Sequence, residues 1–169
     1  EKSKTYLVDK IQSQKIVALI LGGPNKYYSF DNEEISKIFN QIKESFIYNG
    51  YKAIIVPSMR TPKKIIELAK KEFENDGYVV TEVNKQAYLS SLAIASNIVI
   101  TCDSTSMISE AAISGKPIFI AHMKNKRNNY RFKKFFQLFK DMGITKNLGE
   151  KVEYWKYNNF NEAERVAKI

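Results

Sequence analysis

The chain has 169 residues, of which 44% are hydrophobic, with a mean hydropathy of −0.37 and a net charge of +9. This length suits one domain with a good core, and no apolar run approaches the roughly 18 residues that span a bilayer. With a single cysteine and no signal-peptide pattern, we expect a cytoplasmic protein without an internal disulfide. The positive charge favours anionic partners, namely nucleotides, nucleic acid or an acidic membrane surface.

Residues 1–14 are polar and charged, and we expect a tether or the end of a preceding segment there, with residues 15–169 as a single domain. The apolar run 16–21 predicts a fully buried strand. The loop 22–25, Gly-Gly-Pro-Asn, follows it, and we expect unusual backbone angles in this loop. Its two glycines permit the close approach of a ligand or a simple tight turn, and the GxGxxG spacing of dinucleotide sites is absent.

Residues 31–49 predict an amphipathic helix that starts with acidic residues and has apolar side chains at helical spacing. Residues 52–56 predict a second strand, which leads into the loop 57–62. Thr61 in this loop is predicted to cap the next helix, because a threonine hydroxyl accepts the free N–H groups of a first turn. Arg60 precedes that helix directly, where it can hold a phosphate through two N–H bonds or be an exposed basic residue.

The elements that follow are a helix over residues 63–75, which Gly77 is expected to end, and a third strand over residues 78–83. A short helix around residues 88–95 comes next. It leads into the most informative stretch of the chain, residues 97–121.

That stretch predicts a strand, a helix ended by Gly115, and a second strand, which together form one βαβ unit. Such a unit leaves free backbone N–H groups at the start of its helix, where the hydroxyls of Ser104, Thr105 and Ser106 gather. The helix start is therefore a phosphate site, or Asp103 or Ser104 merely caps it. Glu110, inside the helix, can reach a ribose beside the phosphate or be a solvated surface residue.

Cys102 ends the apolar run of the first of these two strands. We expect a small, buried core residue rather than a nucleophile, since His122 is the only histidine that could serve as its base.

Five apolar runs that alternate with helices predict an α/β fold, namely a Rossmann-like parallel sheet with helices on both faces. Ligands of such sheets bind beyond the carboxyl ends of the strands, near the topological switch point. The polar loops 22–25, 58–61 and 103–106 each follow a strand, so we expect them to converge on one rim. Their convergence would be stronger evidence for a ligand site than any single loop.

The chain becomes basic and aromatic after this stretch, within residues 124–140. One interpretation is a surface helix that packs Phe135, Leu138 and Phe139 on the core and points its charges to water. The other is a binding patch for polyphosphate, RNA or anionic lipid. The surface helix is the favoured interpretation. Aromatic residues after Met142 predict a closing segment laid back over the domain. The densest cations are Lys124, Lys126, Arg127, Arg131, Lys133 and Lys134.

Three motifs follow strands of the predicted sheet. They are Leu-Gly-Gly-Pro-Asn-Lys-Tyr-Tyr at residues 21–28, Ser-Met-Arg-Thr-Pro at residues 58–62, and Thr-Cys-Asp-Ser-Thr-Ser-Met-Ile-Ser-Glu-Ala at residues 101–111, the last followed by Gly-Lys-Pro at 115–117. These motifs resemble those of the ELM family of mitochondrial fission proteins, whose bacterial members carry names such as nucleoside-diphosphate-sugar epimerase. The resemblance spans roughly residues 15–120. It identifies the chain as similar to the carboxyl-terminal half of a GT-B glycosyltransferase-like protein.

The resemblance implies that a nucleoside diphosphate or a nucleotide-sugar is the ligand, with no metal and no tightly bound cofactor. It places the diphosphate against Gly22, Gly23, Arg60, Ser104 and Ser106, and the ribose near Glu110. An amino-terminal GT-B half, with the acceptor site and catalytic base, is implied as a partner, so we expect no transfer by this chain alone. The full set of predicted nucleotide- or phosphate-binding residues is Gly22, Gly23, Asn25, Lys26, Ser58, Arg60, Thr61, Asp103, Ser104, Ser106, Met107 and Glu110.

Two functions of different classes remain open from the sequence. The first is a nucleotide-sugar-binding half of a glycosyltransferase-like protein, in which donors neutralise a diphosphate leaving group. The alternative is a non-catalytic interaction module that acts on protein partners or an anionic membrane through residues 124–134. Nucleic-acid binding ranks last, because it rests only on net charge.

Overall fold

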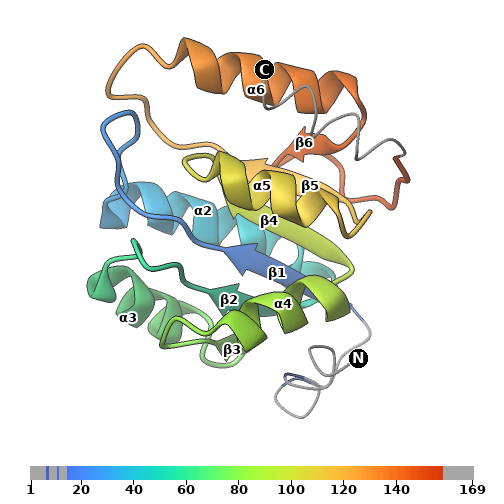
Figure 1. Cartoon of the computed structure of the whole chain (residues 1–169). Coiled ribbons are helices and arrows are strands. Elements are labelled where there is room, and N and C mark those ends of the chain that lie inside the picture. Colours follow the sequence, from blue (N-terminus) through green and yellow to red (C-terminus); the bar gives the residue numbers. More distant parts are fainter. Residues whose placement is uncertain (1–6, 8–10, 12–14, 158–169) are drawn as a thin grey trace.

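In the computed structural model of the chain, Leu7, Ile11 and residues 15–157 are described (Figure 1). Helices and strands alternate along almost the whole of this part. In chain order the elements are β1 (Ile16–Ile20), α2 (Asn32–Ser45), the 3-10 helix η1 (Ile47–Asn49), β2 (Lys52–Val56), α3 (Lys63–Glu72), β3 (Gly77–Val79), α4 (Lys85–Ile94), β4 (Asn97–Thr101), α5 (Thr105–Ala112), β5 (Ile118–Ala121), α6 (Tyr130–Asp141) and β6 (Thr145–Asn147).

The strands form one sheet in the order β3-β2-β1-β4-β5-β6, and every neighbouring pair is parallel. The chain builds outward from β1 to β3, crosses back through α4 to place β4 beside β1, and then builds outward in the other direction. Helices α2 and α3 pack together on one face, while α4 and α5 cover the other (Figure 1). The predicted Rossmann-like parallel sheet with helices on both faces is confirmed, and its switch point lies between β1 and β4.

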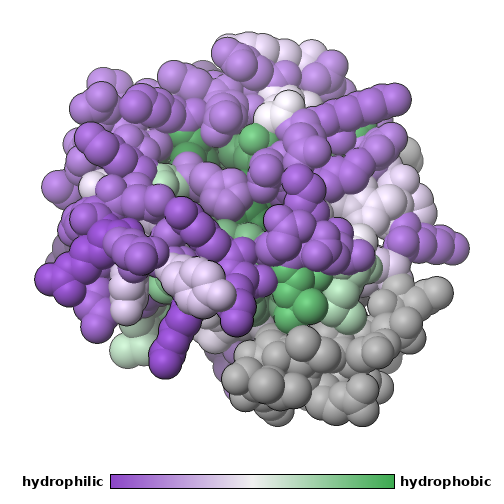
Figure 2. Space-filling view, turned by 90° about the horizontal axis from the view of Figure 1, so that it is seen from above, coloured by the Kyte–Doolittle hydropathy of each residue, from purple (hydrophilic) through white to green (hydrophobic). Residues whose placement is uncertain are grey.

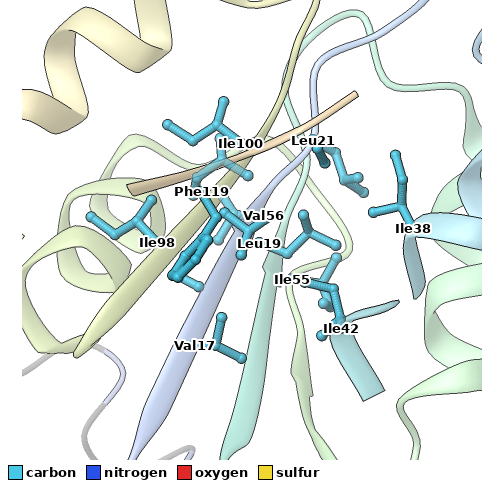
Figure 3. Packing of buried hydrophobic residues seen from close by; sticks show 14 of the residues in the cluster. Val17, Leu19, Leu21, Ile38, Ile42, Ile55, Val56, Ile98, Ile100 and Phe119 are labelled. Atoms are coloured by element: carbon cyan, nitrogen blue, oxygen red, sulfur yellow. The ribbon is translucent and has the colours of Figure 1, made fainter. Parts of the chain in front are cut away.

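The two central strands are buried on both faces, because helices cover the sheet on each side. All five residues of β1 and all five of β4 are buried. Continuous β-branched and aliphatic runs suit such strands, since neither face has to meet water. Figure 3 shows the apolar side chains of β1, β2, β4 and β5 gathered with Ile38 and Ile42 of α2.

Helix α2 starts where its sequence predicts, but it ends at Ser45, and the last residues of the predicted helix form the 3-10 helix η1 instead. The Asp31 carboxylate caps it by accepting the N–H of Glu34 at 2.9 Å, and acidic residues occupy the first turn. Its apolar stripe is buried, which fixes the helix against the sheet. The ammonium of Lys43 in its last turn pairs with Glu72 of α3 at 2.8 Å.

The third strand and the helix before it differ from their predicted bounds. Helix α3 ends at Glu72, three residues early: Phe73 is the C-cap residue, its backbone leaves the helical conformation, and its side chain is fully buried. Gly77 does not end the helix: it opens β3, where a Cβ would lie 1.8 Å from the Ala53 carbonyl oxygen of the neighbouring strand. Strand β3 then ends at Val79 rather than at residue 83.

Two elements near the termini of the described part add to the domain. Leu7 and Ile11 are buried in the core, while the rest of the expected tether and residues 158–169 lie outside the described residues. Trp155 packs edge-on against Phe119 with ring centroids 5.3 Å apart, so the predicted closing segment does lie over the domain as far as Tyr157. Strand β6, which the sequence did not predict, pairs with β5 at the sheet edge.

Within the described residues, no helix combines the length and apolar character needed to cross a bilayer.

The aromatic cluster at Phe119 provides a test of the core. Phe119 is fully buried and meets Phe46 and Trp155 edge to face. We expect Phe119→Ala to lower the free energy of unfolding by about 3–5 kcal/mol, because it removes a ring and leaves a cavity. Urea unfolding measures this. The control Tyr48→Ala, at a side chain 73% exposed, should change the value by less than ~0.5 kcal/mol; equal effects would contradict the packing.

Candidate functional site

The loops that follow β1, β2 and β4 meet at the carboxyl edge of the sheet. The Gly22 N–H donates to the Thr101 hydroxyl at 2.9 Å, and the Gly23 N–H donates to the Asp103 carboxylate at 2.9 Å. The hydroxyl of Thr61 donates to the Gly22 carbonyl at 2.6 Å. The predicted convergence of the three loops on one rim is therefore confirmed.

The two glycines have a different role from those considered in the sequence analysis. Neither has a positive φ, so the unusual backbone angles expected for this loop are not found at its two glycines. A Cβ at Gly22 would lie 2.1 Å from Asp103 Oδ2, and one at Gly23 would lie 2.2 Å from the Arg60 carbonyl oxygen. Both positions require glycine because other loops of the same chain approach the backbone closely.

Asp103 and Arg60 form an ion pair at the centre of this rim. The Asp103 side chain is completely buried, whereas that of Arg60 is 46% exposed. Asp103 Oδ2 accepts from the Arg60 guanidinium at 2.9 Å and from the Ser104 hydroxyl at 3.1 Å, in addition to the Gly23 N–H. Asp103 Oδ1 is also buried and has no hydrogen-bond partner in the described part of the chain. The pair compensates a buried charge that would otherwise be very costly.

Helix α5 starts beside this pair without a side-chain cap. Ser104 occupies the N-cap position, yet its hydroxyl turns to Asp103 and accepts from Arg60 at 3.1 Å. Plain capping by Asp103 or Ser104 is therefore wrong. The first turn of any helix exposes N–H groups that carry the positive end of the helix dipole. Among the described residues, none accepts a hydrogen bond from the backbone N–H groups of Thr105, Ser106 and Met107.

Thr61 and Ser58 hold the β2 loop rather than a helix. Pro62 takes the N-cap position of α3, and Thr61, predicted as the cap, makes no capping bond. The Thr61 hydroxyl instead accepts the N–H of Ser58 at 2.9 Å and contacts the β1 loop. The prediction failed because the hydroxyl has an acceptor in a neighbouring loop, which the local sequence does not reveal.

Asn25 and Lys26 lie at the outer side of the β1 loop. The Asn25 side-chain oxygen accepts the backbone N–H groups of Tyr27 and Tyr28, both at 2.9 Å, and so fixes the turn. Lys26 is exposed, and its ammonium lies 5.3 Å from the centroid of the Tyr27 ring. The Asn25 side chain is thus engaged in holding the turn, while the Lys26 ammonium lies at the exposed surface of the rim.

The remaining predicted residues lie along α5. Ser106 is exposed in the first turn, and Met107 is half-buried against the core. Glu110 is exposed and accepts the Tyr88 hydroxyl at 2.8 Å. Burial, together with this bond to Glu110, raises the pKa of Tyr88 well above its usual range.

Two residues of the site were not predicted. The Thr101 hydroxyl accepts the Gly22 N–H. The sequence feature that could have indicated this role is a hydroxyl at the end of a run of apolar strand residues. Tyr88 binds Glu110 across 22 positions in sequence, and no local pattern could have indicated that pair.

Cys102 lies beneath the rim and is a core residue, as predicted. It is fully buried, its sulfur accepts the Met123 N–H at 3.3 Å, and burial raises the pKa of its thiol to about 12. Across the described residues, no group of three or more His, Cys, Asp and Glu side chains gathers as a metal site would require.

The strand order, together with polar loops at the switch point, defines a Rossmann-like α/β domain. Solved structures of similar fold include UDP-GlcNAc 2-epimerase from Neisseria meningitidis bound to UDP-GlcNAc (TM-score 0.52, 14% identity, 86% of this chain and 34% of the epimerase). Another is peptidyl-cysteine decarboxylase EpiD (TM-score 0.52, 12% identity, 92% and 99% of the two chains). At such identities the likeness shows the fold alone.

The chain belongs to the mitochondrial fission ELM1 family, whose model matches residues 3–169. It is 30% identical to the uncharacterized protein RP120 of Rickettsia prowazekii (strain Madrid E) over 164 residues, which is 92% of this chain and 46% of that protein. It is 25% identical to the mitochondrial fission protein ELM1 of Arabidopsis thaliana over 118 residues, 67% of this chain and 27% of that protein. The chain thus spans less than half the length of either relative, and the family resemblance is confirmed.

Gly23→Ala tests the close approach of the loops. We expect a loss of about 1–3 kcal/mol in the free energy of unfolding, because the added methyl group would strike the backbone of Arg60. Chemical denaturation monitored by circular dichroism measures this. Ser106→Ala, at an exposed position, is the control and should be close to neutral; an equally neutral Gly23→Ala would contradict the packing of the rim.

The thiol of Cys102 should be inert in the folded protein. The thiolate is the reactive form, and a buried thiol with a raised pKa supplies almost none of it. With an aromatic disulfide reagent near about pH 8, we expect the native protein to react at least ~100-fold more slowly than the protein unfolded in guanidinium. A fast reaction of the native protein would instead place the thiol in an accessible site.

Proposed function

We propose that this chain binds a nucleoside diphosphate, free or as part of a nucleotide-sugar, at the carboxyl edge of its sheet. The observation that carries the proposal is the uncapped start of α5 beside the Arg60 guanidinium at the switch point. Backbone N–H groups, a helix dipole and a guanidinium together form the kind of site that binds phosphate. The Gly22–Gly23 backbone would line the opposite side.

Arg60 can serve the ligand while it remains paired with Asp103. A guanidinium carries five N–H donors, and its contacts within the described residues use three of them, to Asp103, Ser104 and the Gly23 carbonyl. The proposed division of labour is that Asp103 positions Arg60, whose remaining donors meet the phosphate. Glu110, held by Tyr88, would face the ribose, as the family resemblance implies.

The choice of ligand class draws on two kinds of support. The fold is similar to that of an epimerase solved with UDP-GlcNAc, which makes the nucleoside diphosphates the first ligands to test. The second kind of support is the site itself, because the free N–H groups of α5 and the Arg60 guanidinium favour phosphate. Donors aimed at the diphosphate would stabilise the charge that develops on a departing leaving group. We assign no transfer step to this chain, which spans less than half the length of the relatives it matches.

A thermal-shift titration with UDP, GDP, ADP and dTDP tests the proposal. A ligand at about a hundred times its dissociation constant adds roughly 2.7 kcal/mol to the free energy of unfolding, which raises the melting temperature visibly. Selective stabilisation by one nucleotide is expected. No shift with any nucleotide at millimolar concentration would count against a site within this chain.

Arg60→Ala is expected to weaken nucleotide binding by about 10- to 100-fold, because it removes charge-assisted hydrogen bonds. Calorimetric titration measures the affinity. Since the change also leaves the Asp103 carboxylate without its partner, Arg60→Lys is measured beside it, as a variant that retains a cation for Asp103. Arg131→Ala, an exposed arginine on α6, is the matched control and should bind as the wild type does. Unchanged affinity in both Arg60 variants would refute the assignment.

A further inference from the structure

The net charge of the chain is concentrated in one region. Between Glu110 and Asp141 the sequence contains no Asp or Glu and eight Lys or Arg, while the whole chain has a net charge of +9. Seven of these cations are exposed, and we call them the basic face. They lie on the segment after β5 and on α6. The basic face consists of Lys124, Lys126, Arg127, Arg131, Lys133, Lys134 and Lys140.

The described part of the chain supplies little negative charge to the basic face. Throughout the described part of the chain, none of its cations takes part in an ion pair. Lys126 reaches only the Asn25 carbonyl, at 3.4 Å, and Lys134 lies over the Tyr130 ring, 5.0 Å from its centroid. The one carboxylate of α6 is Asp141 in its last position, which accepts from Gln137 at 2.7 Å. The Glu34 carboxylate accepts the backbone N–H of Lys124 at 3.1 Å but pairs with Lys37. Within the described residues, the face therefore carries a positive charge that no ion pair offsets.

The aromatic side of α6 packs against the domain and is not available to a partner. Phe139 is buried and stacks on Phe135 with centroids 4.3 Å apart, while the Phe132 ring lies 5.2 Å from both Tyr27 and Tyr28. The favoured interpretation of this segment, a surface helix packed on the core, is confirmed, although Phe135 and Leu138 are only partly buried. The helix cannot turn this side outward without unfolding the domain edge, so any partner meets its charged side.

The outward side of α6 presents one aromatic ring among the cations. The Tyr130 side chain is 62% exposed, and Lys133 and Lys134 lie one helical turn further on. Figure 2, seen from the side of α6, shows a largely hydrophilic surface with apolar patches between hydrophilic residues. A tyrosine flanked by lysines is typical of a protein surface that rests at the headgroup level of a membrane. A single exposed ring offers no row on which successive bases could stack, which disfavours single-stranded nucleic acid.

We propose that the basic face docks this protein on a membrane surface rich in anionic phospholipids. The attachment is electrostatic and peripheral: the cations lie against the headgroups, Tyr130 enters the interface, and the packed aromatic side of α6 stays within the fold. This proposal is independent of the proposed nucleotide site, because it uses none of the phosphate-binding residues.

Co-sedimentation of the chain with vesicles tests the docking. Phosphatidylcholine vesicles that contain about a third phosphatidylglycerol should bind the protein, whereas pure phosphatidylcholine vesicles should not. Binding should fall steeply between low salt and about 0.5 M salt, since ions screen exposed charges. Equal binding to neutral vesicles, or binding that ignores salt, would overturn the electrostatic attachment. No binding to anionic vesicles at low salt would overturn the proposal altogether.

A matched pair of charge-reversal variants assigns the binding to the basic face. Arg131→Glu, Lys133→Glu and Lys134→Glu together lower the net charge from +9 to +3 and should reduce the partition coefficient by at least ~100-fold, since each cation near an anionic surface contributes about fivefold. The control carries Lys63→Glu, Lys64→Glu and Lys71→Glu on α3, at exposed positions and with the same change in net charge. The control should retain most of the binding. It should lose only the part that depends on the net charge of the whole protein, which both variants share.

Equal loss in both triple variants would show that net charge alone governs binding and would overturn the assignment to this face. Circular dichroism checks that both variants are folded. If one variant does not fold, the salt titration of the wild type still tests whether the attachment is electrostatic. A parallel titration with short single-stranded RNA serves as the competitor. RNA binding tighter than vesicle binding, and lost in the same α6 variant, would replace the membrane with nucleic acid as the partner.

Discussion

A carboxylate without solvent exposure must be matched by donors, and at Asp103 those donors come from three different segments. The Gly23 N–H belongs to the loop after β1, the Arg60 guanidinium to the loop after β2, and the Ser104 hydroxyl to the start of α5. All three converge on one oxygen. The geometry of the rim follows from this requirement: the β1 loop has to come so close to its neighbours that a side chain at Gly22 would collide with the carboxylate.

The same ion pair explains why the start of α5 is left without a cap. Ser104 could satisfy N–H groups of the first turn, but its hydroxyl is engaged by Asp103 and Arg60. The helix therefore retains its free donors at the switch point, next to a guanidinium that cannot move away without leaving the buried Asp103 carboxylate unpaired. In the proposed nucleotide site, this rigidity would keep the positive charge of the guanidinium in place before the ligand arrives.

The sequence predicted those features whose cause is local. Strands buried on both faces must be continuous apolar runs, so β1, β2 and β5 were found with little error, and Asp31 marked the start of α2. Features with a distant cause were missed. Strand β6 has the sequence Thr-Lys-Asn and forms only because the edge of β5 is there to pair with it. The role of Thr61 and the ion pair of Arg60 depend on loops about 40 residues away, which only the fold brings together.

The proposed nucleotide site and the basic face are physically connected. The segment after β5 is tied to the segment after β1 by the bridge between Tyr28 and Asn125, by the bond from the Ser29 N–H to the Lys124 carbonyl, and by the Asn129 amide, which donates to the Tyr28 hydroxyl at 2.6 Å. The β1 loop is thus held between the basic segment on one side and the Asp103 pair on the other.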